Sequence, residues 1–245
     1  MYDKGVSGWE RAPISRMIAR FRAIQMRNMT NNGRSRLVAH LSPLLHDPRD
    51  KHELGGLIDA LDSRYSLLRK LDREPGVEDI LAQMLGRLAS SFGSLWNLRG
   101  RRILDVPCGS NTSKAPATVD IRTPLGRLKL GPRHGGYTAL FEPWFCRMLL
   151  LLDADPVGVD SCDLEGEPFE HYTVDLGQPD ALNFLPDASF DGVQDSRLFG
   201  SPEFTAQFPD SSDRLAVAQE LLRQERRLLK PGGVVIHSDA EALLS

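Results

Sequence analysis

Cysteine is scarce in this sequence, and long apolar runs are missing. Its three cysteines, Cys108, Cys146 and Cys162, include no CxxC spacing, which argues against both a disulfide framework and a structural zinc site. The longest apolar run, around residues 148–152, is far shorter than the roughly 18–20 residues of a membrane span. The N-terminal residues lack the apolar core and cleavage site of a secretory signal. These absences predict a cytoplasmic protein with no membrane span and no metal site.

The net charge of −3 hides an uneven distribution. Residues 1–46 carry eight lysines and arginines against two acids, and the rest of the chain has a net charge of −9. A basic N-terminal segment can bind RNA or another anionic partner, or it can be a solvated helix face that complements an acidic body. No recognised nucleic-acid motif and no interleaved aromatic platform accompanies these charges. Both interpretations remain open.

Apolar residues recur at helical spacing through the first hundred residues. The first amphipathic helix is predicted over residues 12–29, with Pro13 in its first turn and Gly33 near its end. Further helices are predicted over residues 34–46, 52–72 and 77–94. Residues 1–100 are therefore expected to form an all-helical region.

From residue 101 onward, short apolar strands alternate with helices. Strands are predicted at residues 102–107, 156–160, 170–175, 190–195 and 233–237, with helices at about 143–152 and 212–229. This alternation is typical of a parallel sheet with helices on both faces. We therefore predict an α/β, Rossmann-like domain over residues 101–245 that follows the helical region.

The first of these strands runs directly into a turn of small residues. Ile103, Leu104 and Val106 form the apolar run of a buried strand. Pro107 ends the strand because it cannot donate to a ladder, and Gly109 lets the backbone approach a ligand closely. Strand, acid and glycine turn in this order are typical of a nucleotide-binding sheet, although an ordinary turn after a strand is the alternative. A GxGxxG pattern is absent here, which disfavours an NAD-dependent oxidoreductase.

Acidic residues stand at or just past the ends of four successive predicted strands. They are Asp105, Asp160, Asp175 and Asp195. Parallel sheets bind ligands at this edge, and a carboxylate after the second strand is suited to accept hydrogen bonds from a ribose diol. Asp175 and Asp195 are equally well explained as strand-end caps.

With these features, residues 101–240 resemble the class I S-adenosylmethionine-dependent methyltransferases. Four segments carry the resemblance. Residues 103–109 resemble the family's first motif, and residues 157–160 resemble its second-strand motif. Residues 185–193 resemble the approach to its fourth strand, and residues 228–235 resemble the turn into its fifth strand. Residues 1–100 show no such resemblance. The resemblance implies S-adenosyl-L-methionine as cofactor and methyl transfer to an unidentified acceptor, most simply a small molecule.

The resemblance also implies a position for each cofactor-binding residue. Asp105 and Gly109, with Pro107 between them, would border the methionine end of the cofactor, and Asp160 would bind the ribose hydroxyls. The residues after the third and fourth strands complete the set. Asp175 and Leu176 would flank the adenine, and Asp195 and Ser196 would face the sulfonium and the acceptor.

Methyl transfer from a sulfonium needs little covalent help, because the leaving group is already activated and alignment supplies most of the rate. No catalytic residue is therefore obligatory. Where the acceptor must lose a proton, the candidates by residue type are His134, Tyr137 and His237. His237 is predicted at the end of the fifth strand, at the ligand edge. A structural role is the alternative for each of them.

The chain departs from the family pattern in three places. Pro107 and Asn111 stand where the first motif usually has glycine. Residues 111–141 form a basic, loop-like insertion, which is interpreted as a lid or acceptor-binding loop over the cofactor mouth, or else as a disordered segment. The last two strands of the family's sheet do not follow His237, so the fifth strand would be an apolar edge.

Two further alternatives follow from these departures. The apolar edge strand would be covered by the N-terminal helices, would pair with a second subunit in a homodimer, or would belong to a shortened gene product. The alternative function is a catalytically silent methyltransferase-like module that binds a partner through its basic helix and insertion loop.

Overall fold

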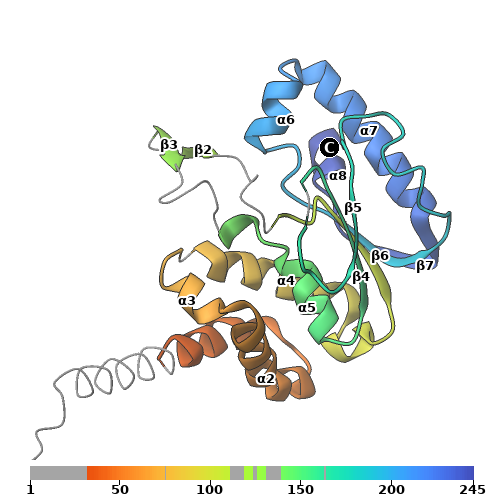
Figure 1. The fold of residues 1–245 in the computed structure, drawn as a ribbon. Coiled ribbons are helices and arrows are strands. Elements are labelled where there is room, and N and C mark those ends of the chain that lie inside the picture. The colour runs from red at the N-terminus through yellow and green to blue at the C-terminus, as the bar shows by residue number, and fades with distance from the viewer. Residues whose placement is uncertain (1–31, 75, 111–118, 124–125, 131–138, 163) are drawn as a thin grey trace, which may run out of the picture.

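The computed structural model describes residues 32–74, 76–110, 119–123, 126–130, 139–162 and 164–245. Within them, five parallel strands form one sheet between two groups of helices (Figure 1). The strands are β1 (Arg102–Val106), β4 (Asp155–Asp160), β5 (Glu170–Thr173), β6 (Phe190–Asp195) and β7 (Leu229–His237). The α/β, Rossmann-like arrangement predicted from the sequence is confirmed.

The order of the strands in the sheet is β5-β4-β1-β6-β7. The chain moves outward from β1 through β4 to β5, and then crosses to the other side of β1 for β6 and β7. All four neighbouring pairs are parallel, so the carboxyl ends of the strands lie at one edge. Open α/β sheets bind ligands where the strand order reverses, which here is the crevice between the ends of β1 and β6.

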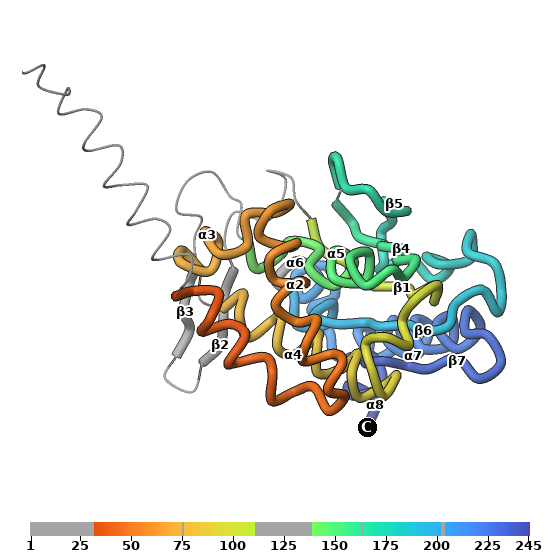
Figure 2. The backbone as a smooth tube through the Cα atoms, turned by 90° about the horizontal axis from the view of Figure 1, so that it is seen from below, coloured from red at the N-terminus to blue at the C-terminus, as the bar shows by residue number. Residues whose placement is uncertain are grey.

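Helices cover both faces of the sheet (Figures 1 and 2). One side carries α2 (Pro48–Tyr65), α3 (Leu67–Leu71), α4 (Gly76–Phe92) and α5 (Trp144–Leu151), and the other carries α6 (Pro202–Gln207), α7 (Ser211–Leu228) and α8 (Asp239–Leu244). Side chains along β1 alternate between the two sides. Ile103 packs with the α4 and α5 cluster, whereas Leu104 and Val106 pack with the α7 cluster. Burial on both faces explains why the strand is apolar along its length.

The N-terminal helices share a hydrophobic cluster with the sheet. Leu54 of α2 and Leu85 of α4 belong to the same buried cluster as Ile103 and Ile236. Helix α4 contacts β7, so the helical region covers one face of this apolar strand. Val235 stays 37% exposed. In the described part of the chain no strand pairs with the outer edge of β7.

The single helix predicted over residues 52–72 is wrong in its extent. Helix α2 begins at Pro48 and ends at Tyr65, and α3 is a separate short helix. Ser66 between them has a φ of 55°, in the left-handed region, and the Asp62 side chain accepts a hydrogen bond from the Leu68 N–H at 2.9 Å. A local side-chain acceptor of this kind competes with the helical ladder and breaks it.

The other predicted helices and strands shift by a few residues. The helix predicted at residues 34–46 occupies 32–41 and is followed by the 3₁₀ turn η1 (Ser42–Leu44). Strand β7 begins four residues earlier than predicted, and β5 ends at Thr173 and leaves Asp175 beyond the strand. A 3₁₀ turn, η2 (Leu95–Leu98), joins α4 to β1.

Several elements were not predicted from the sequence. The segment predicted as a loop, residues 111–141, contains an antiparallel hairpin of β2 (Val119–Thr123) and β3 (Gly126–Leu130), and then η3 (Ala139–Phe141). Helices α6 and α8 are short, and each has a serine cap: Ser201 accepts from the Phe204 N–H, and Ser238 from the Glu241 N–H.

Part of the sequence lies outside the described residues. This holds for the helix predicted over residues 12–29 and for most of the connections around the hairpin. Among the helices that the structure does describe, none has the length and apolar character required to cross a bilayer.

Candidate functional site

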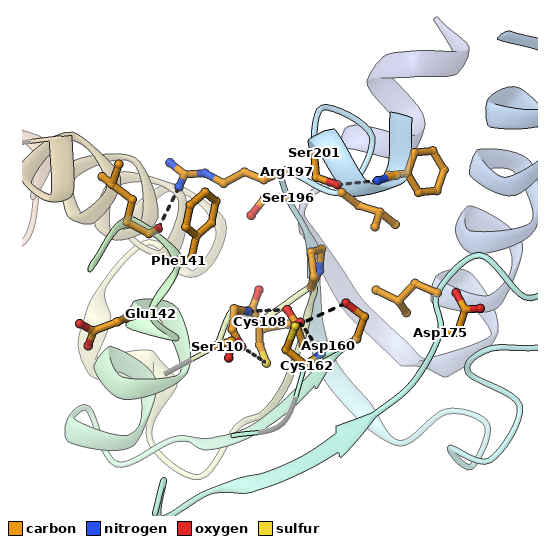
Figure 3. Close-up of a pocket in the computed structure, with 18 of the residues that line it drawn as sticks. Cys108, Ser110, Phe141, Glu142, Asp160, Cys162, Asp175, Ser196, Arg197 and Ser201 are labelled. Carbon is orange, nitrogen blue, oxygen red and sulfur yellow. Dashed lines mark hydrogen bonds between the residues drawn. The ribbon is translucent and has the colours of Figure 1, made fainter. Parts of the chain in front are cut away.

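A pocket opens at the carboxyl edge of the sheet, where β1, β4 and β6 end (Figure 3). Its walls come from six segments of the chain: α4, the end of β1 with the turn after it, η3 and the residue after it, the end of β4, the segment after β5, and the connection from β6 into α6. Seven of the eight predicted cofactor-binding residues line it: Asp105, Pro107, Gly109, Asp160, Asp175, Leu176 and Ser196.

Asp160 joins the turns that follow β1 and β4. Its Oδ2 accepts a hydrogen bond from the Gly109 N–H at 2.8 Å, and its Oδ1 accepts one from the Cys162 N–H at 2.9 Å. The residue is 92% buried yet forms part of the pocket wall. A carboxylate that accepts backbone N–H groups forms strong, charge-assisted hydrogen bonds. Asp160 therefore sets the relative position of two turns that form the pocket.

Gly109 allows the chain before α5 to pack against the turn after β1. Its φ is 94°, and a Cβ atom at this position would lie 2.3 Å from the carbonyl oxygen of Phe141. The next residue, Ser110, donates its N–H to that same oxygen at 2.7 Å. The sequence predicted a glycine that lets a ligand approach. In the structure, the close neighbour is the protein's own backbone.

Asp105 is a buried acid on the side of the sheet that faces α5. Its Oδ1 accepts a hydrogen bond from Gln194 Nε2 at 3.3 Å, and its Oδ2 lies 3.7 Å from Cys146 Sγ. Burial raises the pKa of Asp105 to about 8, and the nearby Asp160 carboxylate contributes in the same direction. The protonation of Asp105 therefore changes close to neutral pH.

Asp175 caps the turn that follows β5. Its carboxylate accepts hydrogen bonds from Gln178 Nε2 at 2.9 Å and from the Gly177 N–H at 3.0 Å, and these bonds lower its pKa. Leu176 beside it is buried in the pocket wall. A Cβ at Gly177 would lie 2.7 Å from Gln207 Nε2, so α6 packs closely over this end of the pocket.

Asp195 does not line the pocket, which corrects its predicted position beside the sulfonium. Its carboxylate accepts hydrogen bonds from the Ser238 hydroxyl at 2.7 Å, from the Ala240 N–H at 3.1 Å and from the Asp239 N–H. Successive side chains of a strand point to opposite faces, and Gln194 is the one that points toward Asp105. Asp195 therefore binds the N-terminus of α8 on the α7 side.

Glu225 of α7 is a second buried acid beside Asp195. Neither of its carboxylate oxygens has a hydrogen-bond partner in the described part of the chain. Burial, reinforced by the Asp195 carboxylate and more weakly by Glu241, raises its pKa well above the usual value. The folded state therefore holds a proton on Glu225 more tightly than the unfolded chain does, and the stability that depends on it falls as pH rises above about 4.5.

We expect Glu225→Gln to stabilise the protein at pH 7–8 by about 1–3 kcal/mol, because an uncharged amide replaces a buried acid. Denaturant unfolding at pH 5, 7 and 8.5 measures this, and the variant should lose less stability than the parent as pH rises. Glu220→Gln, on the exposed face of the same helix, is the control and should leave the slope unchanged. Equal pH slopes for parent and Glu225→Gln would contradict the assignment.

Of the three predicted proton acceptors, the structure describes His237, which does not line the pocket. His237 Nε2 lies 2.8 Å from Asp239 Oδ1, and His237 is not among the residues that line the pocket. His134 and Tyr137 lie outside the described residues, so their predicted roles remain untested.

A buried ion cluster holds one pocket wall to the N-terminal helices. Arg147 of α5 lies between Glu142 and Glu167, with its Nη2 2.6 Å from Glu167 Oε1 and its Nη1 bonded to Glu142. Lys70 of α3 places its Nζ 2.5 Å from the Glu142 carboxylate. Because Glu142 follows Phe141 in the pocket wall, the helical region helps to position this wall.

Seven further residues that line the pocket were not predicted as site residues from the sequence. They are Met84, Leu140, Phe141, Arg197, Leu198, Phe204 and Gln207. The pair Ser201-Pro202 is a typical N-cap and first-turn signal, and it could have revealed α6. No local signal could have placed Met84 of α4 in this wall, because its position depends on how the helical region packs on the sheet.

Comparisons of the chain with protein-family models, with curated proteins and with solved structures each found no match. Among the described residues, no group of three or more histidines, cysteines and acids is placed to hold a metal ion. Functional inference therefore depends on the geometry of the pocket.

Proposed function

We propose that this protein transfers a methyl group from S-adenosyl-L-methionine to a small-molecule acceptor. The observation that carries the proposal is the convergence of residues from four strand ends on one pocket, at the point where the strand order reverses. Asp105, Asp160, Leu176 and Ser196 each come from a different strand end, and each is a residue to which the sequence resemblance assigns a cofactor contact.

The pocket residues fit the chemical parts of this cofactor. A ribose diol requires an acceptor fixed in place, and the Asp160 carboxylate is held by two backbone N–H groups. An adenine ring requires an apolar slot, which Leu176, Leu198 and Phe204 line near Asp175. The amino group at the methionine end requires an acid, and Asp105 lies in the wall after β1.

The cofactor supplies an activated sulfonium leaving group when it is bound. The chain then has to align donor and acceptor and to exclude water, and neither task requires a covalent intermediate on the protein. The walls formed by Phe141 and by α6 enclose the pocket.

We expect the demethylated product, S-adenosylhomocysteine, to bind with release of close to one proton at pH 7. Its ammonium group beside Asp105 would favour the charged carboxylate, which in the free protein is mostly protonated. Calorimetry in phosphate and in Tris buffers measures the release, because the two buffers differ in ionisation enthalpy. Asp105→Asn should abolish it.

Glu170→Gln is the matched control for this experiment. Glu170 is an exposed acid at the opposite end of β5 with a lowered pKa, so it is already charged at pH 7 and should not affect the proton count. Absence of heat with millimolar S-adenosylhomocysteine would contradict the proposed function. That result would favour the catalytically silent binding module.

A further inference from the structure

Arg197 stands in the pocket wall, and no acidic side chain in the described part of the chain pairs with its guanidinium. It directly follows Ser196 at the end of β6, and its backbone N–H donates a hydrogen bond to the Asp239 carboxylate. Its φ of 70° and this hydrogen bond fix the start of the side chain. The guanidinium makes a single long contact in the described structure, from Nη1 to the Leu140 carbonyl oxygen at 3.5 Å (Figure 3).

Arg87 of α4 is a second arginine close to this wall. It lies three residues, about one helical turn, after Met84, which lines the pocket. Arg87 is half-buried, and its side chain has neither a hydrogen bond nor an ion pair among the described residues. Protein atoms packed around the Arg197 guanidinium and, more weakly, the charge of the nearby Arg87 lower the pKa of Arg197, although Arg197 still has part of its surface exposed to solvent.

The acids near these two arginines are engaged elsewhere. Asp239 binds His237 and the Arg197 backbone, and Asp195 binds the N-terminus of α8. Asp105, with a pKa of about 8, is mostly uncharged at pH 7 in the free protein, and with the cofactor bound its carboxylate would pair with the cofactor's ammonium group. By contrast, the buried Arg147 has two carboxylate partners. Among the described residues, no carboxylate therefore pairs with the charge on this side of the pocket.

We propose that Arg197, supported by Arg87, binds an oxyanion on the methyl acceptor, a carboxylate or a phosphate group. A guanidinium presents paired donors that match either group in a bidentate geometry. Arg197 lies beside Ser196, at the β6 side of the pocket, whereas Asp160 and Asp175 lie on the β4 and β5 side (Figure 3).

The apolar wall beside the arginines indicates what else the acceptor carries. Met84, Leu140 and Phe141 line the same pocket as Arg197, and the Leu140 carbonyl oxygen contacts the Arg197 guanidinium. An acceptor with an apolar body and one oxyanion would satisfy both the wall and the guanidinium. The assignment of this oxyanion to a methyl acceptor rests on the proposed methyltransferase function, whereas an oxyanion site at Arg197 does not require that function.

The test uses benzoate, phenyl phosphate and the uncharged benzamide as probes, with the full chain saturated by S-adenosylhomocysteine. We expect benzoate or phenyl phosphate to bind and benzamide not to bind. Arg197→Gln should weaken oxyanion binding about tenfold or more, and Arg87→Gln by about threefold, as expected for the loss of charge-assisted contacts. Arg223→Gln, which removes an exposed arginine of α7 paired with Glu220, should have no effect.

The affinity for S-adenosylhomocysteine, measured on the same variants, separates the outcomes. The proposal requires that this affinity stay within about twofold of the parent, since only a charge-assisted contact to the cofactor would change it further. An equal loss of cofactor and oxyanion binding in Arg197→Gln would assign Arg197 to the cofactor's own carboxylate and overturn the proposal. So would equal binding of benzamide and benzoate, or no oxyanion binding at all.

A protein that fails to bind S-adenosylhomocysteine gives a different result. If benzoate or phenyl phosphate then binds the free protein in an Arg197-dependent way, the methyltransferase function fails and the oxyanion site stands. Arg197→Lys, which keeps the charge and loses the paired donors, should bind oxyanions with intermediate affinity. Circular dichroism of each variant establishes that the fold is retained.

Discussion

Replacement of Asp160 by alanine should abolish measurable binding of S-adenosylhomocysteine. The carboxylate is the residue that the proposed function assigns to the ribose hydroxyls, and loss of its charge-assisted hydrogen bonds should lower affinity by about 100-fold or more. The variant also leaves the Gly109 and Cys162 N–H groups without their acceptor, so the two turns it joins lose their fixed spacing. Calorimetry at a temperature where the variant is folded measures the affinity.

The same substitution should lower the free energy of unfolding by about 2–4 kcal/mol, because two part-buried N–H groups lose a charged partner. Asp155→Ala is the matched control. Asp155 begins the same strand at the opposite edge of the sheet, is half-exposed, and pairs with Arg102 instead of the pocket turns. Binding by Asp155→Ala should match the parent. Unaltered affinity of Asp160→Ala would show that the ribose site is misplaced.

Replacement of Gly109 by alanine should have the largest effect on stability. The added Cβ would lie 2.3 Å from the Phe141 carbonyl oxygen, and the residue would keep a φ of 94° that alanine rarely adopts. Either the turn after β1 or the segment before α5 must move. We expect a loss of about 3–5 kcal/mol, which corresponds to a fall in Tm of roughly 10 °C. Thermal and denaturant unfolding measure both quantities.

Gly93→Ala separates the two causes of this loss. Gly93 also has a positive φ, of 74°, but no atom lies within 4 Å of the position its Cβ would take. It should therefore show only the backbone cost of about 1–2 kcal/mol. The excess loss in Gly109→Ala measures the contact with Phe141. If the two variants lost equal stability, close packing at Gly109 would not be the cause. Because Phe141 lines the pocket, Gly109→Ala should also weaken binding of S-adenosylhomocysteine.

The sequence was sufficient to predict the strands of the sheet and most of the helices around it. Strand β1 was predicted because an apolar run between polar ends is visible in the residues themselves, and α4 because its apolar residues recur at helical spacing. The helix break at Ser66 was missed. There the periodicity of apolar residues continues across a left-handed residue, so the pattern alone cannot show the break.

The candidate site was predicted in part, and the limits have a common cause. Asp160 and Leu176 were placed correctly at the pocket because the ends of parallel strands meet at one edge. Asp195 was misplaced because its direction depends on which face of β6 it occupies, and the pairing of β6 with β7 is irregular next to it. A strand-end acid looks the same in sequence whether it faces a ligand or a helix.

The sequence by itself determined the order of the five sheet strands and the longer helices, the turn after β1 and the acids at the strand ends, because these depend on residues close together in the chain. Only the tertiary structure decided that Gly109 lies against Phe141, that Lys70 joins the ion cluster at Glu142, and that the Arg197 guanidinium lies near the Leu140 carbonyl oxygen in the pocket wall. Each of these contacts joins residues far apart in sequence. Their formation depends on how helices and sheet pack together, which local periodicity does not encode.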